Sequence, residues 1–193
     1  MTFGLTELVP PASEPVTRDE AKAHLRVTDT AEDALIDRLI AVARQAAEAH
    51  TQRAFLAQTF RLVRDKWPNA LCLSLPRPPL IAVDAARLYD ADGIASVWDA
   101  ASYSVDVRWT PGRLCLKSGA TWPAPGRRQG GIEIDFQAGY GANASDVPAA
   151  LRQAVLMLVA HLYENREAIA GETAFEIPAG AAALLAPYRV LSL

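Results

Sequence analysis

The histidines and two short Gly/Asp stretches are the residues of this sequence that could most directly bind a metal or a nucleotide. His24, His50 and His161 fall in predicted helices, and none has the HExxH spacing that holds zinc on one helix face. The Asp-Ala-Asp-Gly stretch at 90–93 resembles the start of a calcium loop but lacks the later glutamate, so we interpret it as a turn. The Gly-Tyr-Gly stretch at 139–141 follows a strand, as a phosphate loop would, but no Lys-Ser/Thr pair accompanies it. We therefore expect no metal and no cofactor.

Acid–base and nucleophilic chemistry also lack a recognisable set of residues. Asp84, Asp106 and Asp135 are spread over separate predicted strands and turns, and the sequence contains no Gly-x-Ser-x-Gly motif. We expect no catalytic residues and no enzyme activity. The alternative is a small hydrolase or ligand-binding domain whose site lies in the β-rich middle of the chain.

Charge and length limit the class of partner. The chain has 193 residues, of which 19 are basic and 22 acidic, and its formal net charge is −3. This balance argues against a large DNA- or membrane-binding surface. The longest apolar helical stretch, 151–163, is shorter than the roughly 20 residues that span a bilayer, and the first residues do not resemble a signal peptide. We expect a folded protein that stays in the cytoplasm where it is made.

The two cysteines, Cys72 and Cys115, lie in separate β-like runs without a metal-ligand neighbour at short spacing. Two interpretations follow from this placement. We favour two buried free thiols, and a cross-strand disulfide is the alternative.

Helical signals dominate both ends of the chain. Residues 1–16 contain three prolines and little periodicity, so we expect an irregular arm. Thr17 and Glu20 form a capping box that starts a short helix. A long helix with a wide, alanine-rich apolar face is predicted over about 31–53, and the strongest helix over 147–167. Because both carry an apolar stripe, we expect these two helices to pack together.

Between these helices the hydrophobic period changes to two. Ile132, Ile134 and Phe136 alternate with polar residues, and similar short runs recur every eight to twelve residues from 56 onward, which is typical of a small antiparallel sheet. The predicted fold class is α+β, mainly a helical bundle of two long helices plus short ones, with an inserted small antiparallel β domain. We expect a single domain over 1–193, with helices at 17–55, the β insert at 56–138, the long helix at 145–169 and a C-terminal segment at 178–193.

The C-terminal segment carries more apolar residues than chain ends usually do. It includes Leu184, Leu185 and Tyr188, next to Arg189. Such a segment either docks on its own core or anchors to a partner, since Tyr and Arg are favoured at interface hot spots. Both interpretations stay open at this point.

Several motifs, taken in order along the chain, resemble the head–tail connector (adaptor) family of long-tailed phages and of phage-derived gene transfer agents. Each motif alone is weak, but the ordered series covers nearly the whole chain. The matching stretches are VTRDEAKAHL at 16–25, DALI at 33–36, LPRPPL at 75–80, YDADG at 89–93, AGYG at 138–141, Val147-Pro148, LYENRE at 162–167 and LLAPYRV at 184–190.

The resemblance implies a virion structural protein rather than an enzyme. Members of the family form a dodecameric ring under the portal, and DNA passes through the ring without sequence recognition. The resemblance further implies assembly in the cytoplasm of a host bacterium and a final location in the neck of a virion or gene-transfer-agent particle. The mildly acidic charge of this chain agrees with DNA that slides through a channel.

The resemblance also implies contact residues. In this family the C-terminal segment commonly engages the clip region of the portal, which makes Leu184, Leu185, Tyr188 and Arg189 the expected portal contacts. The loop from Trp122 to Arg128 is expected to contact the head–tail stopper protein or a neighbouring copy, through Trp122, Arg127 and Arg128. No membrane partner is expected.

Overall fold

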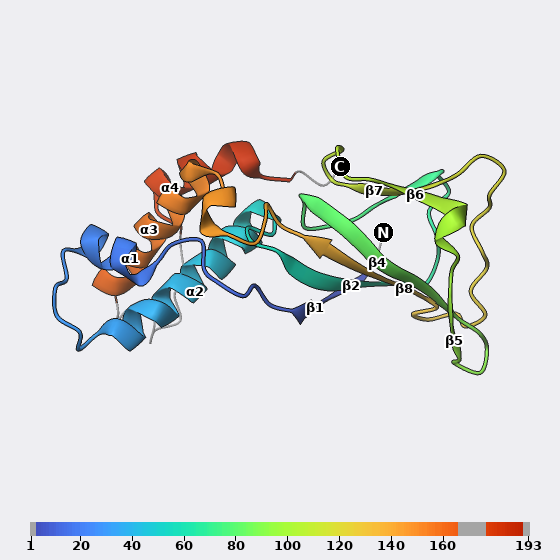
Figure 1. Ribbon diagram of the computed structural model, residues 1–193, viewed down its shortest axis with the longest axis horizontal. Helices are drawn as coiled ribbons and strands as arrows, with labels where there is room; N and C mark the ends of the chain where they lie inside the picture. Colours follow the sequence, from blue (N-terminus) through green and yellow to red (C-terminus); the bar gives the residue numbers. More distant parts are fainter. Residues whose placement is uncertain (1–2, 166–176, 191–193) are drawn as a thin grey trace. The chain divides into compact units, whose positions relative to one another are not determined.

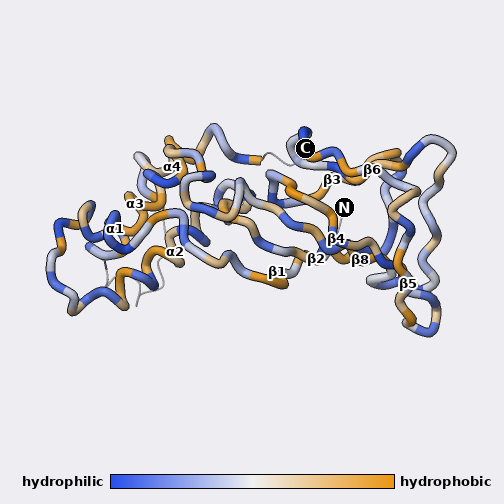
Figure 2. The backbone as a smooth tube through the Cα atoms, viewed as in Figure 1, coloured by the Kyte–Doolittle hydropathy of each residue, from blue (hydrophilic) through white to orange (hydrophobic). Residues whose placement is uncertain are grey.

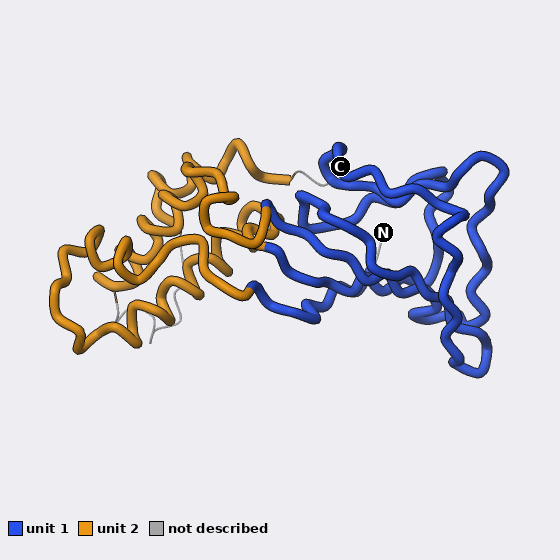
Figure 3. The backbone as a smooth tube through the Cα atoms, in the orientation of Figure 1, with its two compact units in different colours: residues 1–11, 57–140 blue, residues 12–56, 141–193 orange. Residues whose placement is uncertain are grey.

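The computed structural model describes residues 3–165 and 177–190. The chain divides into two compact units, coloured separately in Figure 3. Unit 1 consists of Met1–Pro11 and Ala57–Tyr140, and unit 2 consists of Ala12–Leu56 and Gly141–Leu193. Each unit is therefore built from two separate stretches of sequence.

Unit 1 contains two antiparallel sheets. The larger sheet has five strands in the order β1-β2-β8-β4-β5, and the smaller has three in the order β3-β7-β6. Strands β6 and β7 lie to one side of the larger sheet in Figure 1. The strands are β1 Gly4–Val9, β2 Gln58–Arg64, β3 Cys72–Ser74, β4 Leu80–Tyr89, β5 Ala95–Val97, β6 Tyr103–Asp106, β7 Arg113–Leu116 and β8 Ile132–Ala138, with a 3-10 turn, η1, at Ala100–Ser102.

Strand β8 is the central strand of the larger sheet, and its alternating apolar residues lie in the core, as the sequence predicts. Ile132, Ile134 and Phe136 are fully buried, and Phe136 pairs in register with Phe60 of β2. The two rings stack with their centroids 5.7 Å apart. The smaller sheet turns Leu73 and Leu114 into the same core. The core of unit 1 thus lies between the inward faces of its two sheets.

Four aromatic rings form a second packed group in unit 1. Trp67 and Trp122 stack with centroids 4.4 Å apart, and Trp98 lies 5.3 Å from Trp67 and 4.8 Å from Tyr103. The indole N–H groups are paired as well. Trp67 Nε1 donates to the Pro123 carbonyl over 2.7 Å, and Trp122 Nε1 donates to the Ala70 carbonyl over 2.8 Å. These contacts hold the loops that carry Trp67 and Trp122 against Trp98, which follows β5, and Tyr103 of β6.

Cys72 and Cys115 form a disulfide, so the favoured interpretation as free thiols is wrong. The two residues sit directly opposite each other in the β3–β7 pairing, with Cα atoms 4.0 Å apart. Both cysteine side chains are half-buried. Successive residues of a strand point to opposite faces, and the adjacent Leu73 and Leu114 point inward, so the cysteines point away from the core.

Unit 2 is helical. The capping box is confirmed, since Thr17 Oγ1 accepts from the Glu20 amide over 3.1 Å and the Glu20 carboxylate accepts from the Thr17 amide over 2.7 Å. Helices form within the predicted ranges 31–53 and 147–167 and pack against each other, as their apolar stripes predict. The elements are α1 Arg18–Leu25, α2 Asp33–Thr51, α3 Ala149–Glu164 and α4 Ala179–Leu185, with 3-10 turns η2 at Ala144–Asp146 and η4 at Ala186–Tyr188.

The core of unit 2 combines all four helices, and α1 contributes the fully buried Ala21. Ile36 and Ile40 of α2 are buried against α3, and α4 adds Ala181 and Leu185, both with no exposed surface. From α3 the buried residues are Leu151, Ala154, Val155, Leu158, Val159 and Leu162. The expected ends of the third helix beyond residue 165 lie outside the described residues.

The expectation of a mainly helical bundle is wrong. Of the described residues, 33% are helical and 26% lie in strands, and the strands form two antiparallel sheets. The physical reason is that β structure depends on partners far away in the sequence. Residues 4–9, expected as an irregular arm, form β1 by pairing with β2 some 55 positions later in register, as in Gly4 opposite Val63.

Candidate interaction surfaces

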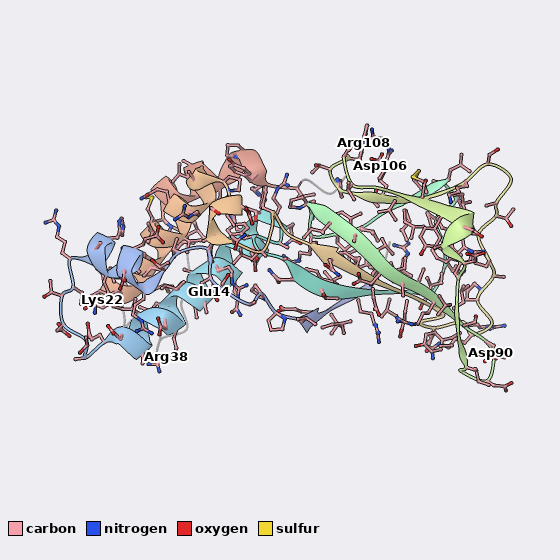
Figure 4. All side chains as sticks on the ribbon, viewed as in Figure 1. Glu14, Lys22, Arg38, Asp90, Asp106 and Arg108 are labelled. Carbon is pink, nitrogen blue, oxygen red and sulfur yellow. A yellow bond between two sulfur atoms is a disulfide. The ribbon has the colours of Figure 1, made fainter. Side chains whose placement is uncertain are left out.

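The Asp-Ala-Asp-Gly stretch at 90–93, which resembles the start of a calcium loop, forms a turn. Asp90 Oδ1 accepts from the backbone N–H of Asp92 and of Ile94, over 3.0 and 2.8 Å, which confirms the turn. Figure 4 labels Asp90 at this hairpin tip. Within the described ranges 3–165 and 177–190, no group of three or more His, Cys, Asp or Glu side chains is arranged to hold a metal ion. In the same part of the chain, no helix is long and apolar enough to cross a membrane.

Asp135 is the most buried aspartate among the catalytic candidates, and it is ion-paired. It accepts from Arg61 Nε over 2.7 Å on β2 and from Arg87 Nη1 over 2.5 Å on β4. The hydrogen bond from Arg61, followed by that from Arg87, holds the pKa of Asp135 below its usual range. Glu133 lies on the same face of β8 and accepts from the Tyr89 hydroxyl over 2.8 Å. This arrangement ties three strands together and provides no free acid or base.

The other two aspartates have different partners. Asp84 accepts from the Gln137 side-chain amide over 2.8 Å, and Asp106 binds Arg113 over 2.8 Å. Figure 4 labels Asp106 together with Arg108 at the turn after β6. The three aspartates therefore serve three separate contacts, and no acid–base pair is formed among them.

The C-terminal segment docks on its own unit through its backbone. The Val190 N–H donates to the Thr51 carbonyl over 2.9 Å, and the Tyr188 carbonyl accepts from Arg53 Nε over 2.5 Å. Of the expected portal contacts, Leu185 is fully buried in the core of unit 2, Leu184 and Tyr188 are half-buried, and Arg189 is exposed. The interpretation that the segment docks on its own core is therefore correct for Leu185, whereas the Arg189 side chain lies at the surface.

Of the residues expected to contact the stopper protein or a neighbouring copy, two pack within unit 1 and one is exposed. Trp122 belongs to the aromatic group described above. Arg127 stacks over the Tyr89 ring at 3.9 Å and donates to the Gly130 carbonyl over 2.9 Å. Arg128 is exposed beside them. Trp122 and Arg127 hold the loop in place, and Arg128 is the member whose side chain reaches solvent.

Exposed apolar side chains mark surfaces that sequence reasoning missed. In unit 1 these include Ile94 and Val97 around β5, and Trp109, which packs on the Arg113 guanidinium at 4.2 Å. Strand β1 adds Leu8 and Val9, and Figure 2 shows apolar colouring along it. The four apolar residues Phe3, Leu5, Leu8 and Val9 before Pro10 were the available signal for β1. Surfaces of this kind are typical of chains that are covered in an assembly.

The chain combines a two-unit α+β fold with exposed apolar residues at a sheet edge, a surface typical of proteins that are covered in an assembly. The particular family follows from comparison with known sequences. The model of the phage gp6-like head-tail connector protein family matches residues 16–84 and 127–189, which is more than half of the chain. The chain belongs to this family, as its ordered motifs indicated. This membership favours a structural role over the hydrolase alternative.

Solved structures with the same architecture come from gene transfer agent (GTA) particles. A chain in the neck of an empty GTA particle, computed with C6 symmetry, is 31% identical with a TM-score of 0.81, covering 98% of this chain and 97% of that chain. A chain in the virion of a native GTA particle has 31% identity and a TM-score of 0.80, covering 98% and 96%. A chain in the neck of a native GTA particle, computed with C12 symmetry, has 31% identity and a TM-score of 0.73, covering 100% and 97%. Among curated proteins, none matches this sequence.

Proposed function

We propose that this head–tail connector forms a ring in the neck of a phage-like or gene-transfer-agent particle, between the portal protein and the head–tail stopper. The observation that carries the proposal is the similarity, at 31% identity over 98% of the chain, to a protein of a GTA neck. A related neck computed with C12 symmetry supports a dodecameric ring. In this proposal the ring assembles in the host cytoplasm and stays in the neck of the particle.

Double-stranded DNA is the proposed content of the ring. The net charge of −3 supports passage without tight binding, because phosphate binding requires clustered cations that release counterions. The guanidinium groups of Arg61 and Arg87 are bound to Asp135, which further reduces the positive charge offered to a phosphate backbone. The ring would therefore surround DNA without reading its sequence.

The portal contact is proposed at the surface of the C-terminal segment. Arg189 is exposed, and Leu184 and Tyr188 of the same segment are half-buried. Leu185 supports this surface from beneath, since it is fully buried. An exposed arginine with adjacent aromatic surface has the composition of an interface hot spot. Residues 178–190 would thus act through side chains held by the backbone contacts to Thr51 and Arg53.

The stopper or neighbour contact is proposed at the loop that ends at Arg128. Trp122 and Arg127 fix the loop through the Trp67 ring and the Tyr89 ring, so Arg128 is presented from a rigid support. A contact on a fixed loop loses less conformational entropy on binding than one on a loose loop.

Two matched arginine variants test these assignments. Both Arg189 and Arg128 are exposed, so alanine at either position should leave the fold intact. We expect Arg189→Ala to weaken portal binding at least about tenfold and to leave stopper binding unchanged, with the reverse for Arg128→Ala. The measurements are size-exclusion chromatography with light scattering and titration against each partner.

The outcomes separate the function from the residue assignments. Wild-type protein that neither binds portal nor forms rings on it would contradict the proposed function. Arg189→Ala protein that binds portal like the wild type would contradict only the contact assignment. Deletion of 180–193 is a poorer test, because it removes Ala181 and Leu185 from the core of unit 2.

A further inference from the structure

Strand β1 is attached to its sheet in an unusual way. None of its six residues is buried, and only Leu5 is half-buried. Among the described elements, β2 is the strand against which β1 packs substantially. Its attachment therefore consists mainly of backbone pairing at a sheet edge, with little side-chain burial to hold it there.

The strand left behind keeps a second partner. Alternate residues of β2, from Gln58 to Arg64, are buried with β1 in place. On its other edge β2 pairs with β8 along its whole length, from Gln58 opposite Ala138 to Arg64 opposite Ile132. The edge of β2 would thus persist as a preformed acceptor if β1 moved away.

Two features mark β1 as a connecting arm. It is followed at once by Pro10-Pro11, a stiff and extended spacer, and the family model begins only at residue 16. It also exposes apolar surface, since Phe3, Leu8 and Val9 are 47%, 41% and 55% exposed. An edge strand with exposed apolar residues is prone to pair with a strand of another chain, and an assembly can use this pairing.

We infer that β1 is an exchangeable arm, which pairs with the β2 edge of a neighbouring copy in the assembled ring. The occupant of each β2 edge is then a second copy of this chain, in the same register as the pairing of Gly4 with Val63. Exchange repeats the same contacts between chains, so it sacrifices no pairing and links each copy physically to the next. This inference rests on the proposed ring, whose cyclic relatives place identical copies side by side.

The register supplies a direct test by cross-linking. A Cβ added at Gly4 would lie 3.7 Å from the Val63 Cβ, a separation that a disulfide spans without distortion. One preparation carries Gly4→Cys and the other Val63→Cys. The two are mixed in equal amounts, assembled on the portal protein, oxidised, and separated on a gel without reductant.

Exchange predicts covalent dimers in this mixture, because the two cysteines reside on different chains. Each copy donates its arm to one neighbour, so a cross-link needs Gly4→Cys on the donor and Val63→Cys on the acceptor. One neighbouring pair in four meets this condition, and each such pair contains two chains, so about half of all chains should appear as dimers. The control mixture of Gly4→Cys with wild-type chains should show background dimers only. Dimers at the control level, in rings that light scattering shows to be complete, would overturn the inference.

The double variant Gly4→Cys/Val63→Cys guards against loss of the fold. As a free chain it should form the bond internally, detected by mass spectrometry of digested peptides, which shows that both substitutions are tolerated. In rings it should give a ladder of cross-linked chains, and a bond that stays internal contradicts exchange. If the wild-type protein forms no ring at all, the proposed function fails, and the inference fails with it.

Discussion

The disulfide between Cys72 and Cys115 makes a quantitative prediction about the stability of unit 1. The two cysteines are separated by 43 residues, a stretch that contains β4, β5 and β6. Closing a loop of this size in the unfolded chain removes conformational entropy that corresponds to about 4 kcal/mol at 25 °C in the chain-entropy model. Strand β3 itself has only three residues and lies at the edge of its sheet, so its pairing alone contributes little.

The perturbation is the double substitution Cys72→Ser/Cys115→Ser, measured by urea unfolding. Both side chains point away from the core, so serine should be accommodated. Tryptophan fluorescence reports unit 1, because Trp67, Trp98, Trp109 and Trp122 all lie within 57–140. A loss of about 4 kcal/mol at a slope of about 2 kcal/mol per M would lower the urea midpoint by about 2 M.

Two controls isolate the effect of the cross-link. Wild-type protein in the presence of a thiol reductant should unfold at the midpoint of the double variant. Ser104→Ala changes a side chain opposite Cys115 on the same outward face and should change the free energy of unfolding by less than about 0.5 kcal/mol. If reduction and the double variant both lower the free energy by less than about 1 kcal/mol, the entropic reasoning is refuted.

Two further predictions concern single side chains. Asp135→Asn should lower the free energy of unfolding at pH 7 by about 2 kcal/mol. The hydrogen bond from Arg61 lowers the pKa of Asp135 in the folded state below its usual 3.8. The stabilisation by Asp135 is therefore present above pH 3.8 and is lost as the pH falls through the lowered pKa. Chemical unfolding at pH 7 and pH 2 checks it, and an equal loss at both pH values would contradict it. Thr17→Ala should cost about 1 kcal/mol by removing the acceptor for the Glu20 amide. Thermal unfolding by circular dichroism checks this against exposed Thr28→Ala, and equal effects would contradict it.

Helices and caps could be predicted because their causes are local. The hydroxyl of Thr17 and the amide of Glu20 are three residues apart, and the apolar stripe of α3 repeats every three or four residues. Family membership could be predicted for a related reason, since short motifs kept their order along the chain. Both the helix signals and the ordered motifs can be recognised in the sequence without knowledge of the tertiary structure.

The pairing of the strands and their cross-links could not be predicted in the same way. Whether Cys72 meets Cys115 depends on a register between two strands that are 43 residues apart. The aromatic group brings Trp67 and Trp122 together from loops with no shared period. The sequence left open whether Leu185 docks on its own core or anchors to a partner, because an apolar residue near a chain end fits a core and an interface equally well. Burial distinguishes the two, and burial is a tertiary property.

The discontinuity of both units sets the order in which the chain can fold during its synthesis. Helix α2 ends at Thr51, but its packing partner α3 begins only at Ala149, so the apolar face of α2 emerges from the ribosome long before it is covered. Strand β2 likewise waits for β8 at Ile132–Ala138. Unit 1 cannot close until the chain has been made as far as Tyr140, and unit 2 cannot close until α3 and α4 have been made. Such contacts between distant stretches of sequence favour slow folding of this chain. Its nascent form should therefore be the stage at which the connector is most prone to aggregation and to chaperone binding.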